Sequence, residues 1–240
     1  SVDAACRLLG RARRESGDQV VSAEYVSRRS LELVLRHVEG AREPLGSPAE
    51  HYLLLELASA DDDEALRAKL TRVLSGGLDA GEILDGAMAE SEAQRRALWL
   101  LRERVPEAER REGGSVKHDV SVRIGKIPEF IARAEPALTR IAPHRLSIYG
   151  HIGDGNLHFN VLPPRWQGID AFRAELGPAF STCVHDLAAS LGGSFSAEHG
   201  VGILKVGELA RYESPTALAL MRTLKSALDP QGIMNPGKLL

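Results

Sequence analysis

The pattern of apolar and polar residues alternates between two periods along the chain. Short runs in which apolar and polar residues alternate predict β-strands, whereas apolar residues that recur every three or four positions predict amphipathic helices. We expect strands at residues 19–25, 51–59, 82–89, 116–124, 145–152 and 156–162. We expect helices from Ser1, at 27–39, 62–75, 91–104, 128–141 and 168–191, and from Ser214-Pro215 to the residues before Asp229-Pro230.

The predicted strands alternate apolar and polar residues, so each strand should bury one face only. This pattern favours an antiparallel β-sheet with helices on one side, an α+β fold of the ferredoxin-like type. The rhythm of strands and helices occurs twice along the chain. We therefore treat residues 1–240 as one domain with a first half at 1–115 and a second half at 116–240 that carries the candidate site.

Composition excludes several classes of protein. The chain has 240 residues, of which 43% are apolar and 26% charged, so it can bury a hydrophobic core. Its 30 Lys and Arg and 33 Asp and Glu are spread along the sequence and leave no basic face for nucleic acid. No apolar stretch reaches the roughly 20 residues of a membrane helix, and the two distant cysteines, Cys6 and Cys183, suit a reducing compartment. We therefore expect a soluble, cytoplasmic protein without a nucleic-acid partner or a transmembrane segment.

Six of the eight histidines lie between residues 118 and 199. In this stretch, Asp154-Gly155 between two alternating runs predicts a β-hairpin with a two-residue turn. Such a turn places His151 directly opposite His158, with Asn160 on the same face. Opposed Cβ atoms about 4.5–5.5 Å apart would allow two imidazoles to bind one metal ion. The alternative is that these side chains are polar cross-strand partners on a solvated face.

A second motif, Glu198-His199 with glycines nearby on both sides, adds a carboxylate and a further imidazole. Two histidines and one carboxylate are a ligand set that leaves open positions on Zn²⁺, Mn²⁺ or Fe²⁺. Adjacent residues of an extended chain point in opposite directions. We therefore expect one of these two residues to be a ligand and the other to be catalytic.

Two cationic residues could complete such a site. Lys117 lies on the polar side of its predicted strand, and Arg102 lies at the border of the apolar stripe of the 91–104 helix. A guanidinium there could bind a carboxylate through two hydrogen bonds. Each residue alone is also typical of an ordinary solvated charge.

Five segments together resemble the C-terminal domain of FAD-linked oxidases, and they follow one another at residues 99–103, 117–119, 150–160, 196–205 and 228–238. This family includes D-2-hydroxyglutarate dehydrogenase, D-lactate dehydrogenase and the flavin subunit of glycolate oxidase. The GHIGDGNLHFN and SAEHGVG blocks are specific to it, and the resemblance covers essentially the whole chain.

The resemblance implies a function and a set of functional residues. The implied reaction oxidises a D-2-hydroxy acid to a 2-oxo acid, with a divalent metal, Zn or Mn, that lowers the pKa of the substrate hydroxyl and with FAD as hydride acceptor. The implied metal ligands are His151, His158 and Glu198; the implied substrate-binding residues are Arg102, Lys117 and Asn160; and the implied general base is His199. The resemblance also implies that Asn235 and Lys238 of the tail lie near the flavin; the alternative is that the tail is a loop that closes the last helix.

This chain departs from the family pattern at two positions. Pro106 stands where the hydroxyglutarate branch has a substrate-binding threonine, which argues against a dicarboxylate substrate. His118 stands where the family usually has an aromatic residue. The FAD-binding domain of the same protein, which would precede Ser1, is an expected partner. We expect this chain alone to hold FAD weakly and to have little or no dehydrogenase activity.

Two other functions remain open from the sequence. One is a stand-alone metal-dependent hydrolase, with water activated at His151, His158 and Glu198. The other is a non-catalytic partner subunit that uses the sheet as an interaction surface. The oligomeric state is also open, with a homodimer as one candidate.

Overall fold

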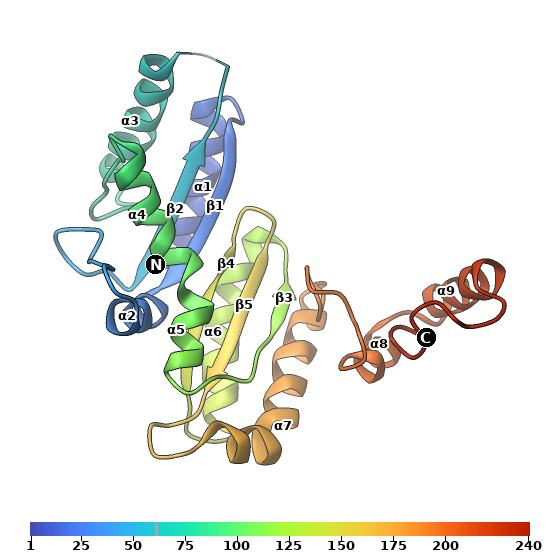
Figure 1. Ribbon diagram of the computed structural model, residues 1–240. Coiled ribbons are helices and arrows are strands. Elements are labelled where there is room, and N and C mark those ends of the chain that lie inside the picture. Colours follow the sequence, from blue (N-terminus) through green and yellow to red (C-terminus); the bar gives the residue numbers. More distant parts are fainter. Residues whose placement is uncertain (61) are drawn as a thin grey trace.

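The computed structural model of the protein describes residues 1–60 and 62–240 (Figure 1). Five strands form one antiparallel sheet in the order β2-β1-β4-β5-β3, so the predicted α+β class is confirmed. The strands are β1 (Val20–Ser27), β2 (His51–Leu57), β3 (Asp119–Ser121), β4 (Arg145–His151) and β5 (Asn156–Leu162). The helices are α1 (Val2–Ser16), α2 (Arg28–His37), α3 (Asp63–Asp79), α4 (Glu92–Glu103), α5 (Val105–Arg111), α6 (Ile127–Thr139), α7 (Ile169–Ser190), α8 (Val206–Tyr212) and α9 (Pro215–Leu228).

One face of the sheet packs against α1, α6 and α7 and forms the main hydrophobic core. The strand residues that point to this face alternate along the sheet, and they include Tyr25, Ile148 and Phe159. They belong to one buried cluster with apolar side chains of the helices, such as Phe130 of α6 and Phe180 of α7. The alternation that predicted the strands therefore also sets which side chains point to the other face.

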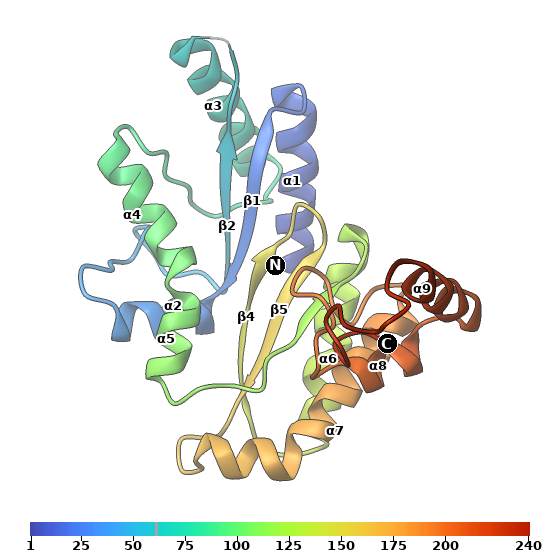
Figure 2. The same ribbon diagram turned by 45° about the vertical axis from the view of Figure 1, so that its right-hand side comes forward.

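The other face of the sheet is covered at one end by α2, α4 and α5, which lie together on one side of the strands in Figure 2. Val26, Tyr149 and Leu162 point to this face and pack with helix residues such as Leu31 and Val105. The expectation that helices cover only one side is therefore wrong. The sequence pattern missed this second layer because the outward positions of the strands are apolar at one end and polar at the other.

Two predicted strands differ from the structure. Residues 82–89 form no strand, and Ile83 instead packs against the cluster that contains Leu8 and Val73, between α1 and α3. In the run 116–124 only β3 forms a strand, and Val116 and Ser121 make isolated bridges to Val161 and Ser194. A short apolar run does not distinguish a strand from a loop that packs against helices. Helices α5 and α8, of seven residues each, are too short to show a clear period, and the pattern does not predict them.

The hairpin between β4 and β5 has a longer turn than the sequence predicts. Residues 152–155 form the turn, and Tyr149, not His151, lies opposite His158. The carbonyl of Ile152 accepts the N–H of Gly155 at 3.3 Å within the turn, and its side chain is fully buried in the main core, so Ile152 belongs to the turn and not to the strand pairing. The predicted direct pairing of the two histidines is therefore wrong by two residues. A shift of two residues preserves the face of every side chain, so both histidines still point to the same side.

Gly155 in this turn leaves no room for a side chain. Its φ is +86°, and an added Cβ would lie 2.0 Å from the carbonyl oxygen of Val122. We expect Gly155→Ala to lower the free energy of unfolding by at least about 2 kcal/mol, because backbone strain and a clash with backbone add. Urea denaturation measures the loss. In the control Gly153→Ala, the new Cβ would meet Ala23 Cβ at an ordinary 3.5 Å, and an equal loss in both variants would contradict the prediction.

The C-terminal segment leaves the sheet and forms an arm of α8 and α9, which lies beyond α7 in Figure 1. Leu209 of α8 and Leu218 of α9 form a small apolar cluster with Phe195, which lies in the segment before α8. Ser214 caps α9 by accepting the N–H of Ala217, as the Ser-Pro start predicts. Among the described residues, no helix is both long enough and apolar enough to cross a membrane.

Candidate metal and substrate site

A cleft with a volume of about 890 Å³ opens over the polar end of the sheet face that carries α4. Strands β1, β3, β4 and β5 contribute its floor, α4 contributes a wall, and the loop 199–205 also lines it. The lining includes most of the residues to which the sequence assigns a role: Arg102, Lys117, His151, His158, Asn160, His199 and Lys238. The fold therefore gathers residues that are far apart in the sequence.

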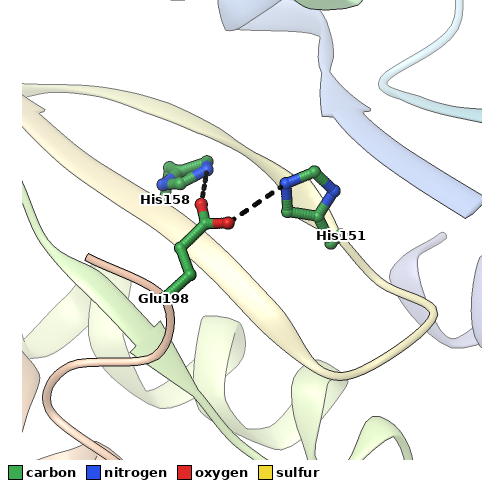
Figure 3. A group of neighbouring side chains, drawn as sticks. All are labelled: His151, His158 and Glu198. Carbon is green, nitrogen blue, oxygen red and sulfur yellow. Dashed lines mark ion pairs between the residues drawn. The ribbon is translucent and has the colours of Figure 1, made fainter. Parts of the chain in front are cut away.

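His151, His158 and Glu198 form a cluster beside this cleft (Figure 3). The Glu198 carboxylate lies between the two imidazoles, with Oε1 at 3.1 Å from His158 Nε2 and Oε2 at 3.6 Å from His151 Nε2. The three ligand atoms lie within 4.8 Å of one another. Two imidazole nitrogens and one carboxylate oxygen are suitable donors for Zn²⁺ or Mn²⁺. The residues present therefore fit a divalent cation.

Glu24 of β1 fixes the orientation of His151, and sequence reasoning missed it. Its carboxylate is almost fully buried and lies 2.7 Å from His151 Nδ1 and 2.6 Å from Arg102 Nε. A carboxylate only accepts hydrogen bonds, so Nδ1 carries the proton and the lone pair of Nε2 faces Glu198. The available signal was that Glu24 lies two residues before the buried Val26 in the same strand. The two side chains therefore share a face of the sheet, and an acidic residue on that face is unusual.

Asp119 of β3 holds the loop that carries Glu198 and His199, and it is a second residue that the sequence did not single out. Its Oδ2 accepts the backbone N–H groups of Glu198 and His199 at 3.0 and 2.9 Å, and its Oδ1 accepts Asn156 Nδ2 at 2.7 Å. Burial raises the pKa of Asp119, but these hydrogen bonds outweigh it and lower the pKa below its usual value. Asp119 is therefore a stable anion below the loop.

His199 lies beside the cluster without belonging to it. Its ring stacks on that of His158 with centroids 5.5 Å apart, and its Nε2 lies 3.6 Å from Glu198 Oε1. The chain bends at residues 197–199, so both side chains reach the same region. Burial, followed by the charge of Arg102, lowers the pKa of His158 to about 4, so this imidazole is a neutral electron-pair donor at pH 7.

The two predicted cations differ in their surroundings. Arg102 is buried, its guanidinium lies 4.9 Å from the centroid of the Tyr149 ring, and its Nε is bound to Glu24. Lys117 is exposed at the rim of the cleft. Of the two predicted cations, Arg102 is thus fixed on the α4 wall of the cleft and Lys117 is exposed at its edge.

Asn160 lies at the floor of the cleft with its amide already bound. Its Oδ1 accepts the N–H of His118 at 3.1 Å, and its Nδ2 donates to both oxygens of Glu109 at 3.0 Å. Burial raises the pKa of Glu109, whose carboxyl also accepts a hydrogen bond from Ser115. The orientation of Asn160 is therefore fixed from below, by a carboxyl that the sequence did not single out.

The two tail residues predicted to lie near a flavin are placed differently. Lys238 lines the cleft, whereas Asn235 lies outside its lining. Asn235 has a φ of +47°, and its carbonyl accepts the N–H of Lys238 at 3.2 Å.

The His118 ring points to the core, where burial lowers its pKa to about 3 and Ser181 lies 3.1 Å from its Nε2.

Comparison with known protein families identifies the family of this chain. The model of the FAD linked oxidases, C-terminal domain family matches residues 1–239. The chain therefore belongs to this family, as the sequence motifs predict.

The curated relatives are longer than this chain. It is 34% identical to the mitochondrial D-2-hydroxyglutarate dehydrogenase of Arabidopsis thaliana, over 98% of this chain and 40% of that protein. It is 39% identical to the D-2-hydroxyglutarate dehydrogenase of Xanthomonas citri pv. viticola, over 90% of this chain and 45% of that protein. The chain thus spans less than half the length of these relatives. The plant protein is named as mitochondrial, so cytoplasmic localisation of this chain stays a prediction.

Proposed function

We propose that this chain is the substrate- and metal-binding domain of an FAD-dependent dehydrogenase that oxidises a D-2-hydroxy acid to a 2-oxo acid. The observation that carries the proposal is the cluster of His151, His158 and Glu198 beside a cleft that is also lined by Arg102, Lys117 and His199. A 2-hydroxy acid offers a carboxylate and a hydroxyl to such a site. Relatives named D-2-hydroxyglutarate dehydrogenase support the same class of reaction.

The residues of the cleft divide the work among binding, orientation and proton transfer. A divalent cation held by His151, His158 and Glu198 would supply positive charge that favours the alkoxide, and FAD would supply the hydride acceptor. Arg102 and Lys117 bind carboxylate, and Asn160 contributes to the floor. His199 Nε2 takes the hydroxyl proton. Asp119, whose Oδ2 lies 3.6 Å from His199 Nδ1, then stabilises the imidazolium.

Calorimetry on the metal-loaded chain tests the proposed substrate class. We expect binding of at least one of D-lactate, D-2-hydroxyglutarate and glycolate, without hydrolysis of esters or amides. Lys117→Met should weaken this binding about 10-fold, because a charge-assisted hydrogen bond is lost. Lys126→Met is the control, since its ammonium pairs with Glu129 on α6. Hydrolytic turnover without hydroxy-acid binding would favour the hydrolase, and no binding of any kind would favour a partner subunit.

His199→Gln tests proton transfer in the longer protein that contains the flavin domain. We expect the rate of flavin reduction by substrate to fall about 10²- to 10⁴-fold, because Gln cannot accept a proton. The metal content should not change, because His199 lies outside the ligand cluster. Anaerobic stopped-flow spectroscopy measures the rate, and elemental analysis measures the metal. Equal loss of metal and rate would show that His199 is a ligand instead.

We also propose that the FAD-binding domain of the same protein covers the arm. Leu220, Leu224 and Leu228 recur at helical spacing on α9 and are 60%, 61% and 76% exposed. Such a stripe is typical of a surface that packs against another domain. The relatives are long enough to contain such a domain, since this chain covers only about 40% of their length. Amide hydrogen exchange in α9 should be slower in the longer protein than in this chain, and equal exchange would contradict the contact.

A further inference from the structure

A second cleft, of about 410 Å³, lies at the opposite end of the hairpin strands from the metal cluster. Arg145 at the start of β4 and Leu162 at the end of β5 line it, whereas His151 is the last residue of β4, at the opposite end of that strand. Helix α2, the end of α6 and the loop after β5 form its other walls. The two clefts share no lining residue, so the second cleft needs a separate explanation.

This second cleft carries an excess of positive charge. Four arginines and two glutamates line it, in a chain whose formal net charge is −3. Of the two glutamates, Glu32 pairs with Arg28 outside the lining at 3.0 Å, and Glu135 pairs with Arg29 at 2.9 Å. Arg165 is exposed and forms no hydrogen bond or ion pair with the described residues. An anion in the cleft would therefore meet the guanidinium of Arg165, which is unpaired among the described residues, in addition to arginines that are already paired with carboxylates.

Two of the four arginines are held in fixed positions. Glu112 accepts hydrogen bonds from Arg36, at 3.0 and 3.1 Å, and from Arg145, and its Oε2 lies 2.6 Å from His37 Nε2. Arg145 Nε also donates to the carbonyl oxygen of Pro163 at 2.9 Å. Side chains that are already ordered lose little conformational entropy when they bind a ligand. The planar guanidinium matches the geometry of a phosphate group.

We propose that this cleft binds a phosphate group, either free or as part of a nucleotide. Arg36, Arg145 and Arg165 approach it from α2, from β4 and from the loop after β5. Trp166 follows Arg165, lies outside the lining and is 81% exposed, so its ring is available to stack on the base of a nucleotide whose phosphate binds in the cleft. The proposal does not depend on the metal cluster or on the proposed dehydrogenase activity.

Calorimetry on the metal-free chain, with inorganic phosphate and AMP at constant ionic strength, tests this site. We expect saturable binding of at least one probe, weakened about 10-fold by Arg165→Gln. The control Arg123→Gln removes the same charge from an exposed position outside both clefts and should leave the affinity unchanged. Equal weakening by both substitutions, or no saturable binding, would overturn the proposal.

The two probes distinguish the source of the phosphate. Tighter binding of AMP than of phosphate, with the difference removed by Trp166→Ala, would identify a nucleotide as the ligand. Equal affinity for both probes, unaffected by Trp166→Ala, would identify free phosphate. Glu198→Gln should change neither affinity, because Glu198 lies in the other site; a change there would place the phosphate at the metal cluster and overturn the proposal.

Discussion

Glu198→Gln is expected to weaken the binding of Zn²⁺ and Mn²⁺ at least about 100-fold. The substitution preserves the size of the side chain but removes the negative charge and one strong ligand. The two imidazoles of His151 and His158 would then be the only donors left in the cluster. Competition with a chromogenic chelator at pH 7.5 measures both affinities, and circular dichroism checks that the fold is intact.

Glu103→Gln is the matched control for this substitution. Glu103 lines the same cleft but does not belong to the ligand cluster, so its loss changes the local charge by the same amount without removing a donor. We expect its effect on metal affinity to stay within about 3-fold, as for a screened surface charge. If both variants lost affinity equally, general electrostatic attraction, and not coordination, would explain the binding.

The predicted part of the site rests on local rules. Side chains alternate between the two faces of a β-strand, so an error of two residues in the register leaves His151 and His158 on the same face. For this reason the wrong turn length did not separate them. The Glu198-His199 motif identifies the third donor by residue type. These features need only the sequence near each residue, so the pattern was sufficient.

The residues that the sequence missed act through tertiary contacts. Glu24 lies 127 residues before its partner His151, and Asp119 lies 79 residues before Glu198. Their roles depend on the strand order β1-β4-β5-β3, which no local pattern specifies. The second helical layer was missed for a related reason, since a strand that is apolar on both faces at one end resembles an ordinary buried strand.

The second large effect is expected for Glu24→Gln, because this buried carboxylate is shared by the buried Arg102 and the partly exposed His151. Arg102 Nε and His151 Nδ1 both donate to Glu24, from 2.6 and 2.7 Å. Glutamine has one oxygen and one NH₂ group, so it can accept from only one of them. If Arg102 loses its partner, a buried charge is left unpaired, and we expect about 3 kcal/mol of stability to be lost.

If His151 loses its partner instead, its ring changes tautomer. The glutamine NH₂ would donate to Nδ1, the proton would move to Nε2, and the lone pair that faces Glu198 would disappear. We therefore expect metal affinity to fall about 10- to 100-fold. Urea denaturation measures the first effect and chelator competition the second.

A double-substitution cycle separates the two effects. Arg102→Met removes the buried charge, so Glu24→Gln should cost less stability in that background, whereas the loss of metal affinity should persist because His151 still faces the glutamine. Glu56→Gln on β2 is the control: its carboxylate pairs with Arg95 at 2.8 Å near the surface, and its loss should cost less than about 1 kcal/mol. If Glu24→Gln lost no more stability than Glu56→Gln and kept its metal affinity, the buried carboxylate of Glu24 would position neither Arg102 nor His151.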